Sequence, residues 1–305
     1  MRRVSAVAVT AATAGSVLAT GAALAPAQAL APAAAGTAAP ALAAPKAPTV
    51  TARGAFLMNA GTGRTLYAKG ADTRLPTGST TKIMTAKVVL ASKGLDLDAK
   101  VTVQKAYSDY IVRNSASSAR LIVGDRVTVR QLLYGLMLPS GCDAAYALAD
   151  KFGTGGTRDA RVKSFIGKMN ATARSLGLKN THFDSFDGGG GRGNYSTARD
   201  LTRLAVSAMK NTTFRAVVAT RSTKQRTATR SGGRRTMAWT NTNPLLNSYP
   251  GTLGIKTGSG PNAKYCLVFA TKRGSKTLYG TLLASSSDVN RAKDAGRLLD
   301  YGFKK

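Results

Sequence analysis

The sequence contains no glutamate: all 14 of its acidic residues are aspartates. It has a single histidine, His182, and two cysteines, Cys142 and Cys266. The missing glutamate excludes any mechanism with a glutamate as general base and any zinc site of the His-Glu-x-x-His type. So few histidines and cysteines also argue against a zinc site built by the protein. We therefore expect neither a metal nor a cofactor.

Acidic residues are missing altogether between Asp200 and Asp288, although the whole chain carries 44 lysines and arginines and a formal net charge of +30. The basic residues that follow one another closely in this segment are Arg215, Arg221, Lys224, Arg226, Arg230, Arg234 and Arg235. This pattern predicts a solvated basic face that attracts polyanions. Specific nucleic-acid binding is disfavoured, because aromatic residues do not alternate with the basic ones.

The two cysteines leave the redox compartment open. Cys142 and Cys266 could form a disulfide in an oxidising compartment. Cys266, however, lies within the apolar run 265–269, where a cysteine is usually a small buried hydrophobic residue. We therefore favour two free, buried thiols and keep the disulfide as the alternative.

The N-terminus has the features of a secretory signal peptide. A positively charged start is followed by a long stretch of Ala, Val, Thr and Leu that ends in Ala27-Gln28-Ala29, a small-residue cleavage site. We expect residues 1–29 to be removed, which leaves a secreted or extracytoplasmic chain without a transmembrane anchor; an uncleaved anchor is the alternative. Residues 30–50 are rich in Ala and Pro and predict a flexible linker. Residues 51–305 form the predicted folded domain.

Apolar periodicity and turn residues give a coarse secondary structure. Helices are predicted after Ser79 and over 129–137, 144–152, 158–176, 196–209 and 289–301. Strands are predicted at 55–58 and 65–68, as a hairpin, and at 254–258, 264–270 and 277–283. The segment 187–194 is mostly glycine and predicts a mobile loop. Strand-rich ends around a helical middle indicate an α/β fold, with one antiparallel sheet formed from both chain ends, flanking helices and a helical insert.

One four-residue stretch, Ser79-Thr80-Thr81-Lys82, could carry chemistry. It follows a Pro and a Gly and leads into an apolar run, so Ser79 and Lys82 would lie on one face at the start of a helix. There a serine nucleophile would have a lysine base beside it and backbone N–H groups near the attacked carbonyl. The alternative is a capping serine with a solvated lysine. His182 is predicted to be a structural residue, because the sequence lacks a Gly-x-Ser-x-Gly elbow.

Two further motifs favour the catalytic interpretation of this stretch over the capping one. The sequence contains, in this order, Ser79-x-x-Lys82, Ser140-Gly141-Cys142 and Lys256-Thr257-Gly258. The set resembles the penicillin-binding proteins and serine β-lactamases, and within them the low-molecular-mass D-alanyl-D-alanine carboxypeptidases and transpeptidases. The resemblance extends over 51–303 and includes the segments 76–85, 138–141, 180–183, 195–201 and 241–258. It implies the fold of that superfamily and makes 51–305 a transpeptidase-like catalytic domain.

The resemblance also implies a role for each motif residue. Ser79 would attack the carbonyl between two terminal D-alanines and form an acyl-enzyme, with Lys82 taking its proton and Ser140 relaying a proton to the leaving amine. Substrate binding would fall to Cys142, Lys256, Thr257, Gly258 and Ser259. Within that set, Lys256 and Thr257 would hold the terminal carboxylate, and the N–H of Ser259 would form an oxyanion hole with that of Ser79.

The sequence departs from the family pattern in three places. Cys142 replaces the usual Asn of Ser-x-Asn, which exchanges an amide for a weak thiol. Asp187-Gly188 stands where the family often has His-Gly, and Leu253 where it often has Asp. These changes put substrate alignment and loop order in question.

The predicted function is that of a serine-type D-Ala-D-Ala carboxypeptidase, or transpeptidase, acting on peptidoglycan stem peptides that end in D-Ala-D-Ala. Penicillins and other β-lactams would inhibit it covalently, and the basic face would contact anionic cell-wall polymers. One alternative is a serine β-lactamase, although the absence of glutamate excludes the glutamate-assisted route. The other is a catalytically weak penicillin-binding wall protein, which Cys142 makes conceivable.

Overall fold

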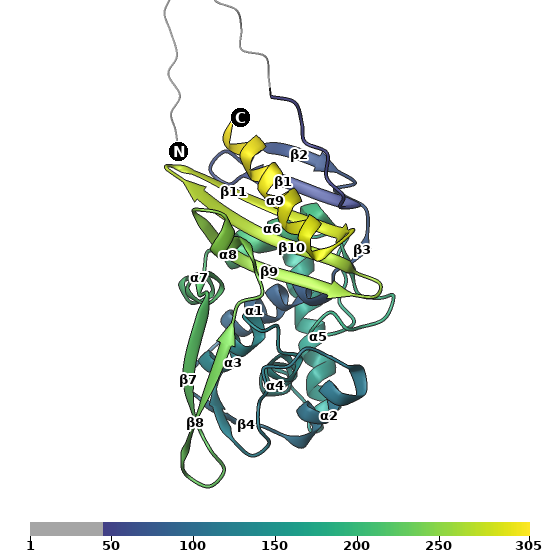
Figure 1. Cartoon of the computed structure of the whole chain (residues 1–305). Helices are drawn as coiled ribbons and strands as arrows, with labels where there is room; N and C mark the ends of the chain where they lie inside the picture. The colour runs from purple at the N-terminus through teal and green to yellow at the C-terminus, as the bar shows by residue number, and fades with distance from the viewer. Residues whose placement is uncertain (1–44) are drawn as a thin grey trace, which may run out of the picture. The chain divides into compact units, whose positions relative to one another are not determined.

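A computed structural model describes residues 45–305 (Figure 1). The predicted signal peptide and most of the predicted linker lie outside these residues. Val50 and Ala52 are already buried in the core, so packed structure begins close to the N-terminal end of the described part. No helix within 45–305 is long and apolar enough to cross a membrane.

The main sheet has five strands in the order β2-β1-β11-β10-β9. Its strands are β1 (Gly54–Asn59), β2 (Thr65–Lys69), β9 (Thr252–Gly260), β10 (Lys264–Arg273) and β11 (Lys276–Ser285). Each neighbouring pair is antiparallel, and β1 from the N-terminal end of the domain pairs with β11 from its C-terminal end. The prediction of one antiparallel sheet built from both chain ends is confirmed.

The helices match most of the ranges predicted from periodicity. They are η1 (a 3-10 helix, Gly78–Thr81), α1 (Lys82–Leu90), α2 (Lys105–Asn114), α3 (Val129–Met137), α4 (Cys142–Phe152), α5 (Arg158–Ser175), α6 (Ala198–Ala208), α7 (Thr212–Ala219), α8 (Leu245–Ser248) and α9 (Asp288–Phe303). For α3 the start is set by a capping box, in which the Thr128 hydroxyl accepts from the Gln131 N–H and the Gln131 side chain accepts from the Thr128 N–H.

The main sheet separates two hydrophobic cores, because alternate residues of a strand face opposite sides. On β1, Phe56 belongs to one core and Leu57 to the other, and on β10 Val268 and Phe269 divide in the same way. The smaller core is closed by α9, which crosses one face of the sheet (Figure 1). The larger core holds α1, which contacts α3, α4, α5, α6 and α7. A polar group on α1 therefore lies deep in the molecule.

A second sheet was missed from the sequence. Its order is β4-β5-β7-β8, with β4 (Lys100–Thr102), β5 (Arg126–Thr128), β7 (Ser222–Ala228) and β8 (Arg234–Thr240); β3 (Leu75–Pro76) pairs separately with β6 (Tyr195–Ser196). The β7–β8 hairpin carries much of the basic segment and extends below the helices (Figure 1). Its few buried side chains, Thr227, Met237 and Trp239, are too sparse to give a strand pattern in the sequence.

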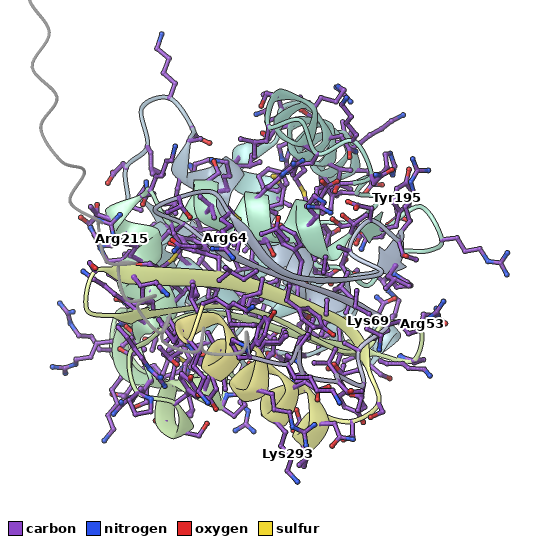
Figure 2. The ribbon with its side chains drawn as sticks, turned by 90° about the horizontal axis from the view of Figure 1, so that it is seen from above. Arg53, Arg64, Lys69, Tyr195, Arg215 and Lys293 are labelled. Carbon is purple, nitrogen blue, oxygen red and sulfur yellow. The ribbon has the colours of Figure 1, made fainter. Side chains whose placement is uncertain are left out.

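Basic side chains are not confined to that hairpin. Figure 2 shows nitrogen-tipped side chains around the periphery of the domain, including Arg53 and Lys69 near the main sheet, Arg215 on α7 and Lys293 on α9. All four are exposed. The positive charge therefore surrounds the molecule, and the hairpin is one part of it.

Candidate active site

Ser79 lies on η1, which leads directly into α1. In a 3-10 helix residues three apart are aligned along the axis, so Ser79 and Lys82 share one face. The turn is pressed against β9 at Gly78, which has φ +50°; a Cβ there would lie 2.9 Å from the Ser259 carbonyl oxygen. A glycine is required because both the backbone angle and the close approach exclude a side chain.

Lys82 is fully buried at the start of α1. Its Nζ donates to Ser79 Oγ at 2.8 Å, to Cys142 Sγ at 3.2 Å and to Ser140 Oγ at 3.4 Å. Within residues 45–305 no carboxylate forms an ion pair with it. An ammonium has three donors and no acceptor, so these three neutral groups match its hydrogen-bonding capacity.

Ser140 sits between α3 and α4 in a left-handed conformation, with φ +66°. For a non-glycine residue this costs about 1 kcal/mol or more. The neighbouring segment holds the strained backbone in place: Ser117 Oγ donates to the Ser140 carbonyl at 2.6 Å, and the Cys142 N–H donates to the Ser117 carbonyl at 2.7 Å. The buried Asp143 carboxylate in turn accepts from the Ala119 N–H at 2.8 Å. These supports were not predicted from the sequence, since Ser117 and Asp143 lie outside the three motifs.

Lys256, Thr257 and Gly258 lie on β9, beside η1. Lys256 is buried and its Nζ donates to Thr257 Oγ1 at 3.4 Å, while the hydroxyls of Thr257 and Thr242 are 2.6 Å apart. At Gly258 a Cβ would lie 2.7 Å from the carbonyl oxygen of Thr77. Glycine thus lets the strand approach the turn that carries Ser79.

A buried arginine, also missed from the sequence, supports this strand from α9. Arg291 is 6% exposed, donates to the Gly258 carbonyl at 3.0 Å and forms an ion pair with Asp288. Burial lowers the pKa of Arg291, and the nearby charge of Asp288 partly opposes this shift. The guanidinium fixes the backbone of the third motif from behind.

The electrostatics of the site are dominated by cations. Burial lowers the pKa of Lys256 well below its ordinary value, and the nearby Lys82 and Arg291 charges lower it further. Lys256 therefore holds its proton less tightly than an exposed lysine does. Burial raises the pKa of the Cys142 thiol against the opposing effect of Lys82.

Both cysteines are free and buried, as favoured from the sequence. Cys266 lies in the sheet core on β10, where burial raises its pKa to about 11. Cys142, by contrast, contacts Lys82. The two thiols therefore have different surroundings and only one belongs to the candidate site.

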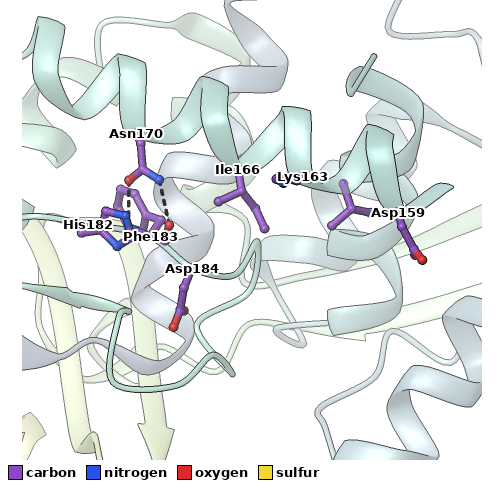
Figure 3. Close-up of a pocket in the computed structure, with 8 residues that line it drawn as sticks. Asp159, Lys163, Ile166, Asn170, His182, Phe183 and Asp184 are labelled. Atoms are coloured by element: carbon purple, nitrogen blue, oxygen red, sulfur yellow. Dashed lines mark hydrogen bonds between the residues drawn. The ribbon is translucent and has the colours of Figure 1, made fainter. Parts of the chain in front are cut away.

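His182 does not join the site. Its Nδ1 hydrogen-bonds with the Gly193 carbonyl at 2.7 Å and its ring is exposed. It lines a separate pocket beside α5 (Figure 3), next to Phe183, whose backbone N–H and carbonyl both bond to the Asn170 amide, at 2.9 and 2.8 Å. None of the motif residues lines this pocket. His182 is thus a hydrogen-bonded structural residue, as predicted.

The glycine-rich loop 187–194 was predicted to be mobile from its composition, but both of its ends are fixed. Asn194 donates to the hydroxyls of Thr77 and Thr81 at 2.9 and 3.2 Å, next to Ser79. At the other end, a Cβ on Gly188 would lie 1.9 Å from the Gly78 carbonyl oxygen. The loop packs against the turn that carries Ser79 through contacts that glycine content does not reveal.

The fold and this arrangement define a class of protein: hydrolases with a serine and a lysine at the start of a buried helix and a Lys-Thr-Gly strand on the sheet beside them. The penicillin-binding proteins form this class. Comparison with known proteins then identifies the family. Residues 41–286 match the D-alanyl-D-alanine carboxypeptidase family, peptidase S11.

Individual relatives agree with this match. The chain is 65% identical over 272 residues to the D-alanyl-D-alanine carboxypeptidase of Streptomyces sp. strain K15. The matched region covers 88% of this chain and 94% of that relative. The chain is 33% identical over 254 residues to the D-alanyl-D-alanine carboxypeptidase DacF of Bacillus subtilis, and that match covers 83% of this chain and 62% of that relative. The crystal structure of the Streptomyces K15 DD-transpeptidase is similar with a TM-score of 0.85 at 67% identity, covering 85% of this chain and all of that one.

The chain therefore belongs to the D-alanyl-D-alanine carboxypeptidase family and is a hydrolase of the penicillin-binding-protein class. This confirms the family, the enzyme class and the fold class predicted from the three motifs.

The depressed pKa of Lys256 predicts that this residue destabilises the fold at neutral pH. Between its folded pKa and its ordinary value of 10.5 the unfolded chain binds more protons than the folded one, so the stability linked to Lys256 is complete only above 10.5 and is lost as pH falls. We expect Lys256→Met to raise the free energy of unfolding at pH 7 by about 1–2 kcal/mol. The gain should shrink as pH rises towards 10.5, as measured by denaturant unfolding.

Lys293→Met is the matched control, because Lys293 is exposed on α9; it should change stability by less than about 0.5 kcal/mol. A Lys256→Met variant that is less stable than the wild type at pH 7, or whose gain widens with pH, would contradict this account of the site.

Proposed function

We propose that this chain is a serine D-Ala-D-Ala peptidase of peptidoglycan stem peptides, with Ser79 as nucleophile and Lys82 as base. The observation that carries the proposal is the 2.8 Å contact between Lys82 Nζ and Ser79 Oγ, in a buried site where no carboxylate of residues 45–305 pairs with the lysine. The base must be the neutral amine, which has two donors and one lone pair; its Nζ accepts the Ser79 proton as Oγ bonds to the carbonyl carbon between the two D-alanines. This pairing follows the general logic of a nucleophile beside its own base.

The acyl-enzyme forms in two steps. Attack places negative charge on the carbonyl oxygen. The N–H groups of Ser79 and Ser259 donate to this oxygen, and each donor lowers the free energy of the transition state by about 3 kcal/mol. The C–N bond then breaks, and the terminal D-alanine leaves as a neutral amine after Ser140 relays to it the proton that Lys82 holds. The 3.4 Å distance between Lys82 Nζ and Ser140 Oγ supports this relay.

The terminal carboxylate of the substrate binds to Lys256 and Thr257. Lys256 Nζ has one hydrogen-bond acceptor among the described residues, Thr257 Oγ1 at 3.4 Å, which leaves donors for an anion. A bound carboxylate supplies the negative charge that the buried lysine lacks. Gly258, with no side chain, keeps the strand close enough to Ser79 for one substrate to reach both groups.

The acyl group leaves the enzyme by transfer either to water or to an amine. The K15 relative is named a carboxypeptidase, and the similar structure from the same strain is named a DD-transpeptidase. We propose that this chain uses both acceptors and that penicillins acylate Ser79, as inhibition by β-lactams is known for the family. A β-lactamase is disfavoured, since the sequence has no glutamate to assist rapid deacylation.

The proposed location is extracytoplasmic, at the cell wall. The predicted signal peptide supports it, together with the wall substrate of the family. An additional contact with anionic wall polymers is supported by the β7–β8 hairpin. Lys224 and Arg226 share one face of β7, and Arg234 lies on the same face of β8 because it pairs with Ala228. All three basic side chains are exposed.

For the nucleophile, Ser79→Ala should abolish covalent labelling by a labelled penicillin and lower D-alanine release from a stem-peptide analogue by about 10⁴-fold or more. The fold should persist by thermal unfolding, and Ser231→Ala, in the exposed turn of the hairpin, should leave both activities unchanged. Stable label with D-alanine release supports the peptidase, rapid loss of label supports a β-lactamase, and label without release supports a weak penicillin-binding protein. Label retained by Ser79→Ala would refute the assignment.

For the anionic polymer, the triple variant Lys224→Gln/Arg226→Gln/Arg234→Gln should elute from an immobilised polyphosphate column at lower salt than the wild type, because screened charge contacts are lost. Its rate of acylation by penicillin should not change. The matched control, Arg53→Gln/Arg64→Gln/Lys293→Gln, removes as many exposed charges away from the hairpin. Equal shifts for the two triples would show that overall charge, and not the hairpin, binds the polymer.

A further inference from the structure

The hydroxyl of Thr257 has a neighbour that belongs to none of the three motifs. Thr242 lies in the segment between β8 and α8, and its Oγ1 is 2.6 Å from Thr257 Oγ1. Thr257 is only 6% exposed, whereas Thr242 is exposed. Because Thr257 is proposed to bind the terminal carboxylate of the substrate, a second hydroxyl at this distance affects how that carboxylate is held.

Backbone contacts fix the segment that carries Thr242. The Thr242 N–H donates to the carbonyl of Leu138, at the end of α3, at 3.1 Å. The side-chain amide of the preceding residue, Asn241, donates to two carbonyls at the end of α7, those of Val218 and Thr220, at 3.2 and 3.0 Å. The segment is thus tied to two helices, and the Thr242 hydroxyl meets Thr257 from a fixed backbone.

The hydrogen-bonding capacity of Thr257 decides what it can offer a substrate. A hydroxyl has one hydrogen to donate and two lone pairs that accept. One lone pair of Thr257 accepts from Lys256 Nζ at 3.4 Å. Either hydroxyl can be the donor in the contact with Thr242. If Thr257 donates to Thr242, its only hydrogen is used, and none remains for a carboxylate. If Thr242 donates, the hydrogen of Thr257 is free for the substrate.

We propose that Thr242 is a positioning residue for the terminal carboxylate: its hydroxyl donates to Thr257 Oγ1, so that the Thr257 hydrogen is directed to the substrate. The inference rests on the proposed function, in which Lys256 and Thr257 bind that carboxylate. An ionised carboxylate only accepts hydrogen bonds, so its binding requires this one of the two arrangements. No covalent bond changes; Thr242 selects the direction of one O–H group.

This arrangement makes Thr242 a determinant of specificity for a charged chain end. With it, Lys256 and Thr257 both donate to the anion, and hydrogen bonds to an ionised acceptor are about twice as strong as those between neutral groups. A neutral amide at the same place gains less from the direction of the Thr257 hydrogen. Thr242 therefore favours peptides that end in a free carboxylate, the chain end on which a carboxypeptidase acts.

The first test compares Thr242→Val, which replaces the hydroxyl by a methyl group, with Thr242→Ser, which keeps it. Two stem-peptide analogues that end in D-Ala-D-Ala, one with a free carboxylate and one with a terminal amide, compete with acylation by a labelled penicillin. Thr242→Val should raise the inhibition constant of the free acid about fivefold, the factor typical of one hydrogen bond, and that of the amide less than about twofold. Thr242→Ser should restore the wild-type value.

Two results of this comparison would overturn the proposal. Equal losses for the two peptides would show that Thr242 has a structural role that does not depend on the carboxylate. A Thr242→Ser variant as weak as Thr242→Val would show that the hydroxyl is not the group that matters. The matched control is Thr240→Val, since Thr240 is exposed on β8 two residues earlier; it should leave both inhibition constants unchanged.

A double-mutant cycle with Thr257→Val tests whether Thr242 acts through Thr257. In the Thr257→Val background, Thr242→Val should change the inhibition constant of the free acid by less than about twofold, because the hydroxyl that transmits the effect is gone. A loss as large as that in the wild-type background would overturn the proposal. Thermal unfolding checks that each variant is folded. A wild-type enzyme that takes no label would instead refute the proposed function, so the two failures are distinguishable.

Discussion

The central constraint of this molecule is a lysine amine that is buried without a carboxylate to neutralise it anywhere in the described part of the chain. Placing Lys82 at the start of α1 removes it from water, which would cost several kcal/mol if its donors were unmatched. The three neutral acceptors match them: Ser79 comes from the turn before α1, and Ser140 and Cys142 come from the segment that leads into α4. Both η1 and the segment that leads into α4 must be in place before the amine is satisfied.

The segments around the active site pack so closely that at several positions only glycine, which has no side chain, fits. Gly78 lies against β9, Gly258 lies against the Thr77 carbonyl, and Gly188 lies against Gly78. Ser140 adopts a left-handed conformation that only surrounding hydrogen bonds can maintain. The stability lost in strain and in two buried lysines is offset by the large apolar cores on either side of the sheet. A stable scaffold therefore keeps the reactive geometry fixed before substrate arrives.

Local patterns in the sequence predicted what local forces determine. The helix over 129–137 and the strands at both chain ends follow from spacing and caps, and the three motifs indicated the site because each is a short unit. Hydrogen bonds between residues far apart in the sequence could not be predicted. Arg291 bonds to Gly258, and Ser117 to Ser140, only because the folded chain brings them together. The β7–β8 hairpin was missed because its strands are mostly basic and polar. The loop 187–194 was predicted to be mobile from its glycine content. That prediction missed its anchors, Thr77, Thr81 and Gly78, because they lie more than a hundred residues earlier in the chain.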